Sequence, residues 1–332
     1  MRGIPMKKYT ITIIIVIAFA VILYVILHNF LSGDKSNTSV EKNVNNSSSE
    51  NQDAISKEPE VNTDTIAYGL YNAEGKYIDN GSKLTAENNV VNVNVSIDHN
   101  LNERREYALI VLEDFKQKSF NLENKKEATK KYLFTMNPNT SKNIGVKVPV
   151  NPNAQELTFL LTKKPNYKLK EMDPNKAAIL GEVLSMRYPL DHNNKSTNLK
   201  ETKPDDMIKD GLNENLFITS DKQKLKSVIA EKEGKALSFS VGNDTEKPLR
   251  YAIIAFKDWK QTDVTESEKV LYTTVAASER QLFDFKLPHA KKDSNFQLIA
   301  FPYPYQVSKD NYESQQAFGS FRTVVEPSNR PE

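Results

Sequence analysis

The chain has 332 residues, with 45 Lys and Arg against 43 Asp and Glu, and 38% of its residues are hydrophobic. This balance excludes the concentrated basic excess of a nucleic-acid-binding protein, so no nucleic acid is expected among its partners. The sequence has no cysteine, which excludes disulfides, thiolate chemistry and a lipid-modified cysteine, and leaves hydrophobic cores as the source of stability.

An uncharged apolar segment, residues 9–31, follows a basic tail at residues 1–8. As a helix that rises about 1.5 Å per residue, it is long enough to cross a hydrocarbon core of about 30 Å. It exceeds the apolar region of a secretory signal, and no small-residue cleavage site follows, so we predict an uncleaved single-pass transmembrane anchor in the lipid bilayer. The basic tail predicts a cytoplasmic N terminus at the cell membrane and an extracellular remainder.

Residues 33–63 are rich in Asn, Ser, Glu and Lys and contain few large apolar side chains. Such a segment cannot bury enough apolar surface to offset the entropy lost on ordering. We therefore predict a disordered stalk between the anchor and the folded part. The Lys- and Asn-rich composition favours a bacterial protein.

An internal repeat aligns residues 105–117 (REYALIVLEDFKQ) with residues 249–261 (LRYAIIAFKDWKQ), with six identical positions. Collinear matches continue on both sides with small changes of loop length, and they pair Gly181 with Gly319. Collinear blocks of this kind indicate an internal duplication.

Each copy has the pattern of a β protein. Apolar and polar residues alternate in residues 91–97 and 237–241, which predicts strands with one buried face. Residues 107–112 and 251–256 are apolar at odd and even positions alike, as a central strand should be. This predicts one central strand per copy. With six or seven strands per copy, the fold class is expected to be mainly β and to resemble immunoglobulin or fibronectin β-sandwich domains. The expected ranges are 64–189 for the first domain, 190–213 for the linker, 214–327 for the second domain and 328–332 for the tail, and each domain is expected to fold alone.

Motifs for chemistry are weak. The four histidines, His28, His99, His192 and His289, lie at no spacing that places two on one face, so no metal site is expected. The segment from Asp98 begins like a calcium loop but lacks the required glycine at its sixth position. Asp114 and Asp258 share a repeat position and are interpreted as turn residues. No catalytic residue and no small-molecule cofactor are predicted.

One aromatic and proline-rich segment, residues 301–305 (FPYPY), is a candidate for recognition. Tyrosines on a proline-stiffened loop offer contact area at low entropic cost, as in binding loops. The alternative is that these rings pack beneath a connection between strands. The matching segment of the first copy, residues 163–167, is basic instead of aromatic. The candidate binding residues are Phe301, Tyr303, Tyr305, Asp258 and Trp259.

These patterns predict a non-enzymatic protein of the cell surface that binds another cell-envelope protein or polymer. Two alternatives stay open: a hydrolase or transferase of cell-wall polymers with a site between the domains, and a structural spacer in a membrane complex. Repeated sandwiches without a nucleophile, metal or phosphate-loop motif favour binding, although a fold never fixes a function.

Overall fold

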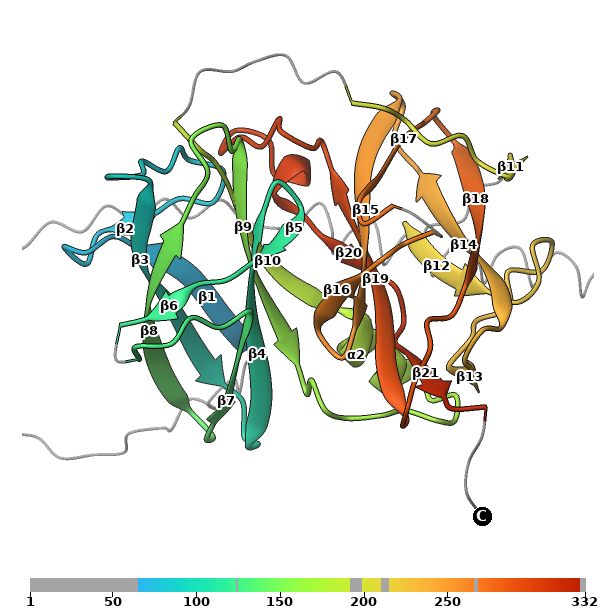
Figure 1. Cartoon of the computed structure of the whole chain (residues 1–332), viewed down its shortest axis with the longest axis horizontal. Helices are drawn as coiled ribbons and strands as arrows, with labels where there is room; N and C mark the ends of the chain where they lie inside the picture. The colour runs from blue at the N-terminus through green and yellow to red at the C-terminus, as the bar shows by residue number, and fades with distance from the viewer. Residues whose placement is uncertain (1–64, 124, 192–198, 210–214, 266–267, 329–332) are drawn as a thin grey trace, which may run out of the picture. The chain divides into compact units, whose positions relative to one another are not determined.

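The computed structural model describes residues 65–123, 125–191, 199–209, 215–265 and 268–328 (Figure 1). The fold is mainly β, as the sequence predicts, with a single α-helix among these residues. The expected anchor, residues 9–31, and the expected stalk, residues 33–63, lie outside the described part of the chain. Within that part, no helix is long and apolar enough to cross a membrane.

The first half of the described chain forms two sheets. One has the strand order β2-β1-β3-β8-β6, and the other has the order β10-β9-β4-β5, with β7 also paired to β4. In β3, Val91, Val93 and Val95 are buried and alternate with the more exposed Asn92 and Asn94, as a strand with one core face requires. The bounds are β1 (Thr65–Tyr71), β2 (Tyr77–Ile78), β3 (Val90–Asn100), β4 (Arg105–Glu113), β5 (Lys116–Lys118), β6 (Asn121–Leu122), β7 (Lys131–Met136), β8 (Thr140–Pro149), β9 (Glu156–Lys163), α2 (Pro174–Gly181) and β10 (Val183–Pro189).

The second half also forms two sheets. Their strand orders are β11-β18-β14-β12 and β13-β21-β19-β15-β16, with β17 on β15 and β20 on β19. Part of the predicted linker contributes β11, which pairs with β18. The bounds are β11 (Asp206–Ile208), β12 (Leu216–Thr219), β13 (Ala230–Lys232), β14 (Ala236–Asn243), β15 (Leu249–Lys257), β16 (Lys260–Thr262), β17 (Leu271–Val275), β18 (Glu279–Lys286), β19 (Ser294–Pro302), the 3-10 helix η1 (Glu313–Gln315), β20 (Phe318–Gly319) and β21 (Thr323–Glu326).

Each half has a hydrophobic core between its two sheets. In the first half, Val95 and Leu109 are fully buried in a cluster that draws on both sheets. In the second half, Phe239 stacks on Phe283 with ring centroids 5.1 Å apart. Fully burying one such side chain stabilises the fold by about 1.5–3 kcal/mol relative to leaving it exposed. The two clusters therefore hold the sheets of each half together.

Two hairpins carry the repeated Asp-aromatic pair. The loop between β4 and β5 is Asp114-Phe115, and the loop between β15 and β16 is Asp258-Trp259. All four residues have positive φ, between 46° and 66°, as a two-residue type I′ turn requires. The Asp114 carboxylate also accepts hydrogen bonds from the main-chain N–H groups of Gln155 and Glu156. Both aspartates thus lie in turns, as their repeat position suggests.

The helix α2 connects β9 to β10. The Asp173 carboxylate caps its N terminus by accepting a hydrogen bond from the Lys176 main-chain N–H at 3.1 Å, and Pro174 stands at its first position. Its last residue, Gly181, lies close to Ser320 and Phe321 of the second half. The helix therefore brings the two halves into contact beside β10.

Candidate functional site

The outer faces of β4 and β15, with β9 and β19 beside them, meet in a third hydrophobic cluster that contains residues of both halves. This contact explains why β4 and β15 are apolar at both parities: Leu109 and Val111 face the first core, whereas Ile110 and Leu112 face the second half. The buried members are Ile110, Leu112, Phe115, Leu160, Val183, Ala252, Ile254, Phe256, Trp259, Ile299, Phe301 and Ala317. We call this set the interface cluster.

Two glutamines at matching positions of the repeat join the halves reciprocally. The main-chain N–H of Gln117 donates to Gln261 Oε1 at 2.6 Å, and the main-chain N–H of Gln261 donates to Gln117 Oε1 at 2.9 Å. The side-chain amides then donate to the carbonyl oxygens of Trp259 and Phe115, each at 2.9 Å. Each bond has its counterpart from the other half, as at the interface of a two-fold symmetric dimer.

A buried ion pair lies at the edge of the interface cluster. Arg187 and Glu156 are 0% and 1% exposed, and Arg187 Nε donates to Glu156 Oε1 at 2.9 Å. Glu156 Oε2 also accepts from the main-chain N–H of Tyr305 at 3.0 Å, and Arg187 Nη1 donates to the Pro302 carbonyl at 2.7 Å. Because Tyr305 and Pro302 belong to the second half, this pair ties the two halves together.

Arg322 makes the corresponding contact in the opposite direction. Its Nη1 donates to the Lys164 carbonyl at 2.9 Å, and its guanidinium lies 4.6 Å from the centre of the Trp259 ring. Arg322 Nη2 also donates to the Lys163 carbonyl at 2.6 Å. Lys163 stands opposite Tyr107 in the first half as Pro302 stands opposite Tyr251 in the second, so the carbonyls of Lys163 and Pro302 occupy matching places. Burial lowers the pKa of Arg322 to about 9. This value is still above neutral pH, so the guanidinium stays protonated there.

The five residues predicted for binding lie mostly within this contact between the halves. Phe301 is 0% and Trp259 is 3% exposed, and both belong to the interface cluster. Asp258 lies in its turn, and its Oδ1 accepts a hydrogen bond from the main-chain N–H of Asn295 in β19. The Tyr305 and Tyr272 hydroxyls are 2.8 Å apart, and the Tyr303 hydroxyl donates to Glu313 Oε2 at 3.0 Å. In this conformation Phe301 and Trp259 offer almost no surface to a partner, and their role in binding stays a prediction.

Replacing Tyr305 by Phe will lower the free energy of unfolding by about 0.5–1.5 kcal/mol, because it removes the hydrogen bond to the Tyr272 hydroxyl and leaves that group partly buried. Urea unfolding followed by circular dichroism measures the change. The matched control is Tyr312→Phe, whose ring is 75% exposed and whose loss of a hydroxyl is expected to change nothing. If the two variants change the free energy of unfolding equally, the hydrogen bond between Tyr305 and Tyr272 does not stabilise the fold as expected.

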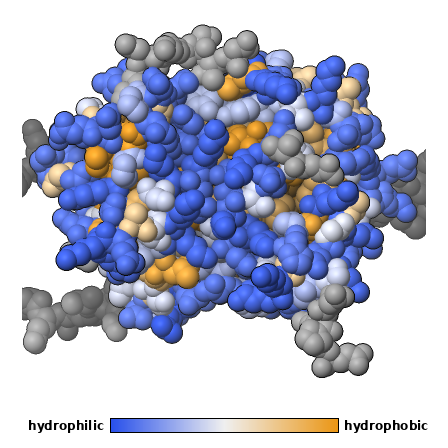
Figure 2. Space-filling model, in the orientation of Figure 1, coloured by the Kyte–Doolittle hydropathy of each residue, from blue (hydrophilic) through white to orange (hydrophobic). Residues whose placement is uncertain are grey.

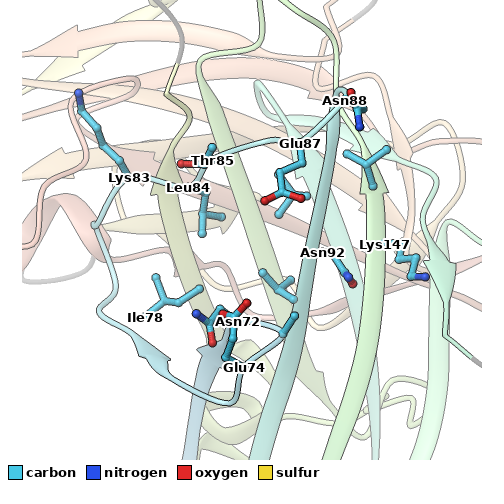
Figure 3. A pocket seen from close by; sticks show the side chains of 14 residues that line it. Asn72, Glu74, Ile78, Lys83, Leu84, Thr85, Glu87, Asn88, Asn92 and Lys147 are labelled. Carbon is cyan, nitrogen blue, oxygen red and sulfur yellow. The ribbon is translucent and has the colours of Figure 1, made fainter.

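A separate cavity of about 640 Å³ opens beside β3 in the first half. Figure 3 shows its border, with Ile78 and Leu84 pointing into the opening, Asn72 and Glu74 at one end and Glu87 at the other. The residues that line it are Asn72, Ala73, Glu74, Ile78, Lys83, Leu84, Thr85, Glu87, Asn88, Val90, Val91, Asn92, Val93 and Lys147. We call this cavity the β3 window.

The window exists because β3 is longer than the strand beside it. Strand β1 pairs with β3 only as far as Tyr71, which stands opposite Asn94. The chain then turns away and returns through a two-residue turn, in which Glu87 and Val90 exchange main-chain hydrogen bonds. Between these two points β3 has β8 on one side and, within the part of the chain that the structure describes, no strand on the other. Sequence reasoning missed this site, although the Asn88-Asn89 turn was a visible signal for a hairpin here.

The face of the molecule in Figure 2 is mostly hydrophilic, with small and separate hydrophobic patches. This fits the burial of the largest apolar side chains inside the two cores and the interface cluster. Among the described residues, no group of three or more His, Asp or Glu side chains is placed to hold a metal ion.

No family model matches the sequence, and no curated protein matches it. Among solved structures, the chain is similar to a red sea bream transglutaminase (8% identity, TM-score 0.21, 80% of this chain and 31% of that one). It is also similar to the secreted serine protease VesC from Vibrio cholerae (9% identity, TM-score 0.22, 75% of this chain and 50% of that one). The YadV chaperone matches at 10% identity and a TM-score of 0.22, over 78% of this chain and 99% of that one. The chain thus spans half or less of the first two proteins, and TM-scores this low carry no argument about function.

Proposed function

We propose that this protein is a single-pass membrane protein, anchored by residues 9–31 and raised on a stalk at residues 33–63, whose extracellular part binds another component of the cell envelope. The apolar and basic pattern of the N-terminal residues supports the anchor and its orientation. The observation that supports a binding function is the β3 window, a cavity on the surface of the first half.

The extracellular part consists of two immunoglobulin-like domains that arose by duplication. The two halves begin in the same way. The first strand of each half belongs to one sheet, and the segment that follows it crosses to the other sheet. There this segment runs parallel to the end of the half. The second half does this with β12 on β14 and β13 on β21, and the first half with β1 on β3 and Leu84 beside Leu190. This crossing, the matching sheet orders and the reciprocal glutamine contacts support the duplication.

The binding proposal is favoured over a site between β4 and β15 by the packing found there. A cavity of about 270 Å³, lined by Val183 of the first half and by Phe217 and Phe321 of the second, does open between the halves, but it is smaller than the β3 window. The interface cluster fills the contact between β4 and β15 with apolar side chains, and the buried Arg187–Glu156 pair is held by hydrogen bonds on both sides. Both features join the copies. The β3 window instead lies on the first copy alone, with polar side chains around an aliphatic floor.

Protease added to intact protoplasts is expected to remove nearly all of the protein, which stays with the membrane fraction at full length before treatment. The positive N-terminal tail places the rest of the chain outside the cell, where the protease acts, and the uncleaved span holds the full-length protein in the membrane. Immunoblotting of membrane and medium fractions with an antibody against residues 199–328 measures them. Recovery of a soluble form that begins near residue 33 would show that the span is cleaved.

Purified cell-wall material is expected to sediment the full-length protein in detergent, with binding saturating as the amount of wall increases. A membrane protein with one transmembrane helix and no outer domains serves as the control for adhesion of the detergent micelle. Failure to bind both isolated wall material and solubilised envelope proteins would refute a binding function and favour the spacer.

A further inference from the structure

We propose that the β3 window, together with the neighbouring tyrosine pair Tyr71 and Tyr77, is a sugar-binding site for a neutral segment of a glycan. The inference rests on the proposed binding function and selects the polymer over the protein as the partner. Its three supports are the chemistry of the lining, the tyrosine pair and the short length of the open edge of β3.

The lining has the chemistry that recognises a sugar. Side chains with amide, carboxylate, ammonium and hydroxyl groups surround an aliphatic floor made by Ile78 and Leu84. Such convergent polar groups over an apolar surface match a ring that carries hydroxyls on its edge and C–H groups on its face. Two acids, Glu74 and Glu87, are balanced by two bases, Lys83 and Lys147. The balance gives no net attraction for a charged ligand, and therefore favours a neutral one.

Two tyrosines are chain neighbours of residues that line the window: Tyr71 precedes Asn72, and Tyr77 precedes Ile78. Tyr71 and Tyr77 are direct partners across β1 and β2, and their rings meet edge to face with centroids 5.4 Å apart. Leu70 faces the core, so Tyr71 faces outward by the alternation of the strand, and Tyr77 is 50% exposed. Aromatic rings with one polar end suit a ligand that is apolar on one face and wet on its edge.

Gly69 has no side chain, and this leaves the space that the Tyr77 ring occupies. A Cβ atom there would stand 2.6 Å from Cε2 of Tyr77, which is far inside van der Waals contact. The ring therefore lies directly over the backbone of β1. A larger residue at position 69 has to displace it.

The open edge of β3 is too short for an extended peptide. Val90 directs its main-chain N–H and C=O away from β8 toward Glu87, and alternate residues of an antiparallel strand share one direction. The main-chain groups of Asn92 therefore face the window, between the Glu87 contact at one end and β1 at the other. One residue supplies a donor and an acceptor for a compact ligand, but it gives no ladder for an added strand.

The test is isothermal titration of the full-length protein in detergent with four neutral trisaccharides: those of N-acetylglucosamine, cellulose, maltose and mannan type. At least one is expected to bind, and Tyr77→Ala and Glu87→Gln are each expected to weaken it by about tenfold, the effect of about 1.4 kcal/mol. The matched control is Tyr167→Ala, which removes a ring that is 44% exposed elsewhere on the first half. It is expected to bind like the unchanged protein.

Gly69→Val tests the placement of the ring. It is expected to lower the affinity for the sugar to the level of Tyr77→Ala. The double variant Gly69→Val with Tyr77→Ala is expected to bind the sugar no more weakly than either single variant. Binding of none of the four sugars, or binding that Tyr77→Ala and Glu87→Gln leave unchanged, would overturn the proposal. A peptide of alternating Val and Thr that binds in place of the sugars, and loses affinity in both variants, would overturn it in favour of a protein partner. If Tyr77→Ala and Glu87→Gln still sediment with wall material like the unchanged protein, the sugar site is refuted, but the proposed binding function is not.

Discussion

Replacing Arg187 by Met will lower the free energy of unfolding by about 3–5 kcal/mol, because it leaves the Glu156 carboxylate buried without its counter-charge. The remaining donor at Glu156 Oε2, the main-chain N–H of Tyr305, does not neutralise the charge. The same substitution removes the hydrogen bond to the Pro302 carbonyl, a second tie to the second half. Urea unfolding monitored by circular dichroism gives the difference.

Two further variants separate the buried charge from the loss of contacts. Arg187→Met combined with Glu156→Gln is expected to recover much of the lost stability, because the uncompensated charge is gone. Lys222→Met breaks an ion pair with Asp284 whose partners are 35% and 53% exposed, and is expected to cost at most about 1 kcal/mol. A double variant as unstable as Arg187→Met would show that the lost hydrogen bonds dominate.

The strands of the fold were predictable because each copy carries its own pattern. Alternation in residues 91–97 predicts the inward valines of β3, which the structure confirms. The helix α2 was missed, although Asp173 and Pro174 stand where an N-cap and a first-turn proline belong. A sequence of eight helical residues gives too short a periodic pattern to be recognised without those end signals.

The interface between the halves was within reach of the sequence, but its meaning was not recognised. A sheet of an isolated sandwich has one dry face and one wet face. Apolar residues at both parities of β4 and of β15 therefore indicate a second covered face in each copy. Because both copies share the pattern at the same repeat position, the simplest arrangement is that the two faces cover each other, as they do in the structure.

The candidate site was harder to predict for a physical reason. Composition does not distinguish an exposed aromatic loop from a buried one: Phe301 is buried, whereas Tyr77, in a segment without a distinctive motif, is half exposed. The β3 window depends on the residue at which β1 stops pairing with β3. That point follows from the register of two strands and from the turn between them, which side-chain pattern alone does not determine.

Although the sequence predicts that each half folds alone, the contact between the halves leads us to expect that they unfold together in one transition. Separating them would expose the interface cluster to water and break the reciprocal glutamine bonds and the ties of Arg187 and Arg322, so a state with one half folded is strongly disfavoured. The chain has a single tryptophan, Trp259, and it lies in the interface cluster, so its emission reports on this contact. Tryptophan emission and circular dichroism are expected to change at the same urea concentration, and the calorimetric and van't Hoff enthalpies are expected to agree.

A core variant in one half provides the stricter test. Phe239→Ala leaves a cavity in the second core, where the ring is fully buried, and is expected to lower the free energy of unfolding by about 3–5 kcal/mol. If the halves are coupled, amide exchange in β3 of the first half will accelerate to the same extent as exchange in β14, because both open only in the shared transition. Protection of β3 that is unchanged by Phe239→Ala would mean that each half keeps its own stability. The repeat would then behave as two independently folding domains, and the contact between them would be a docking surface that opens without unfolding.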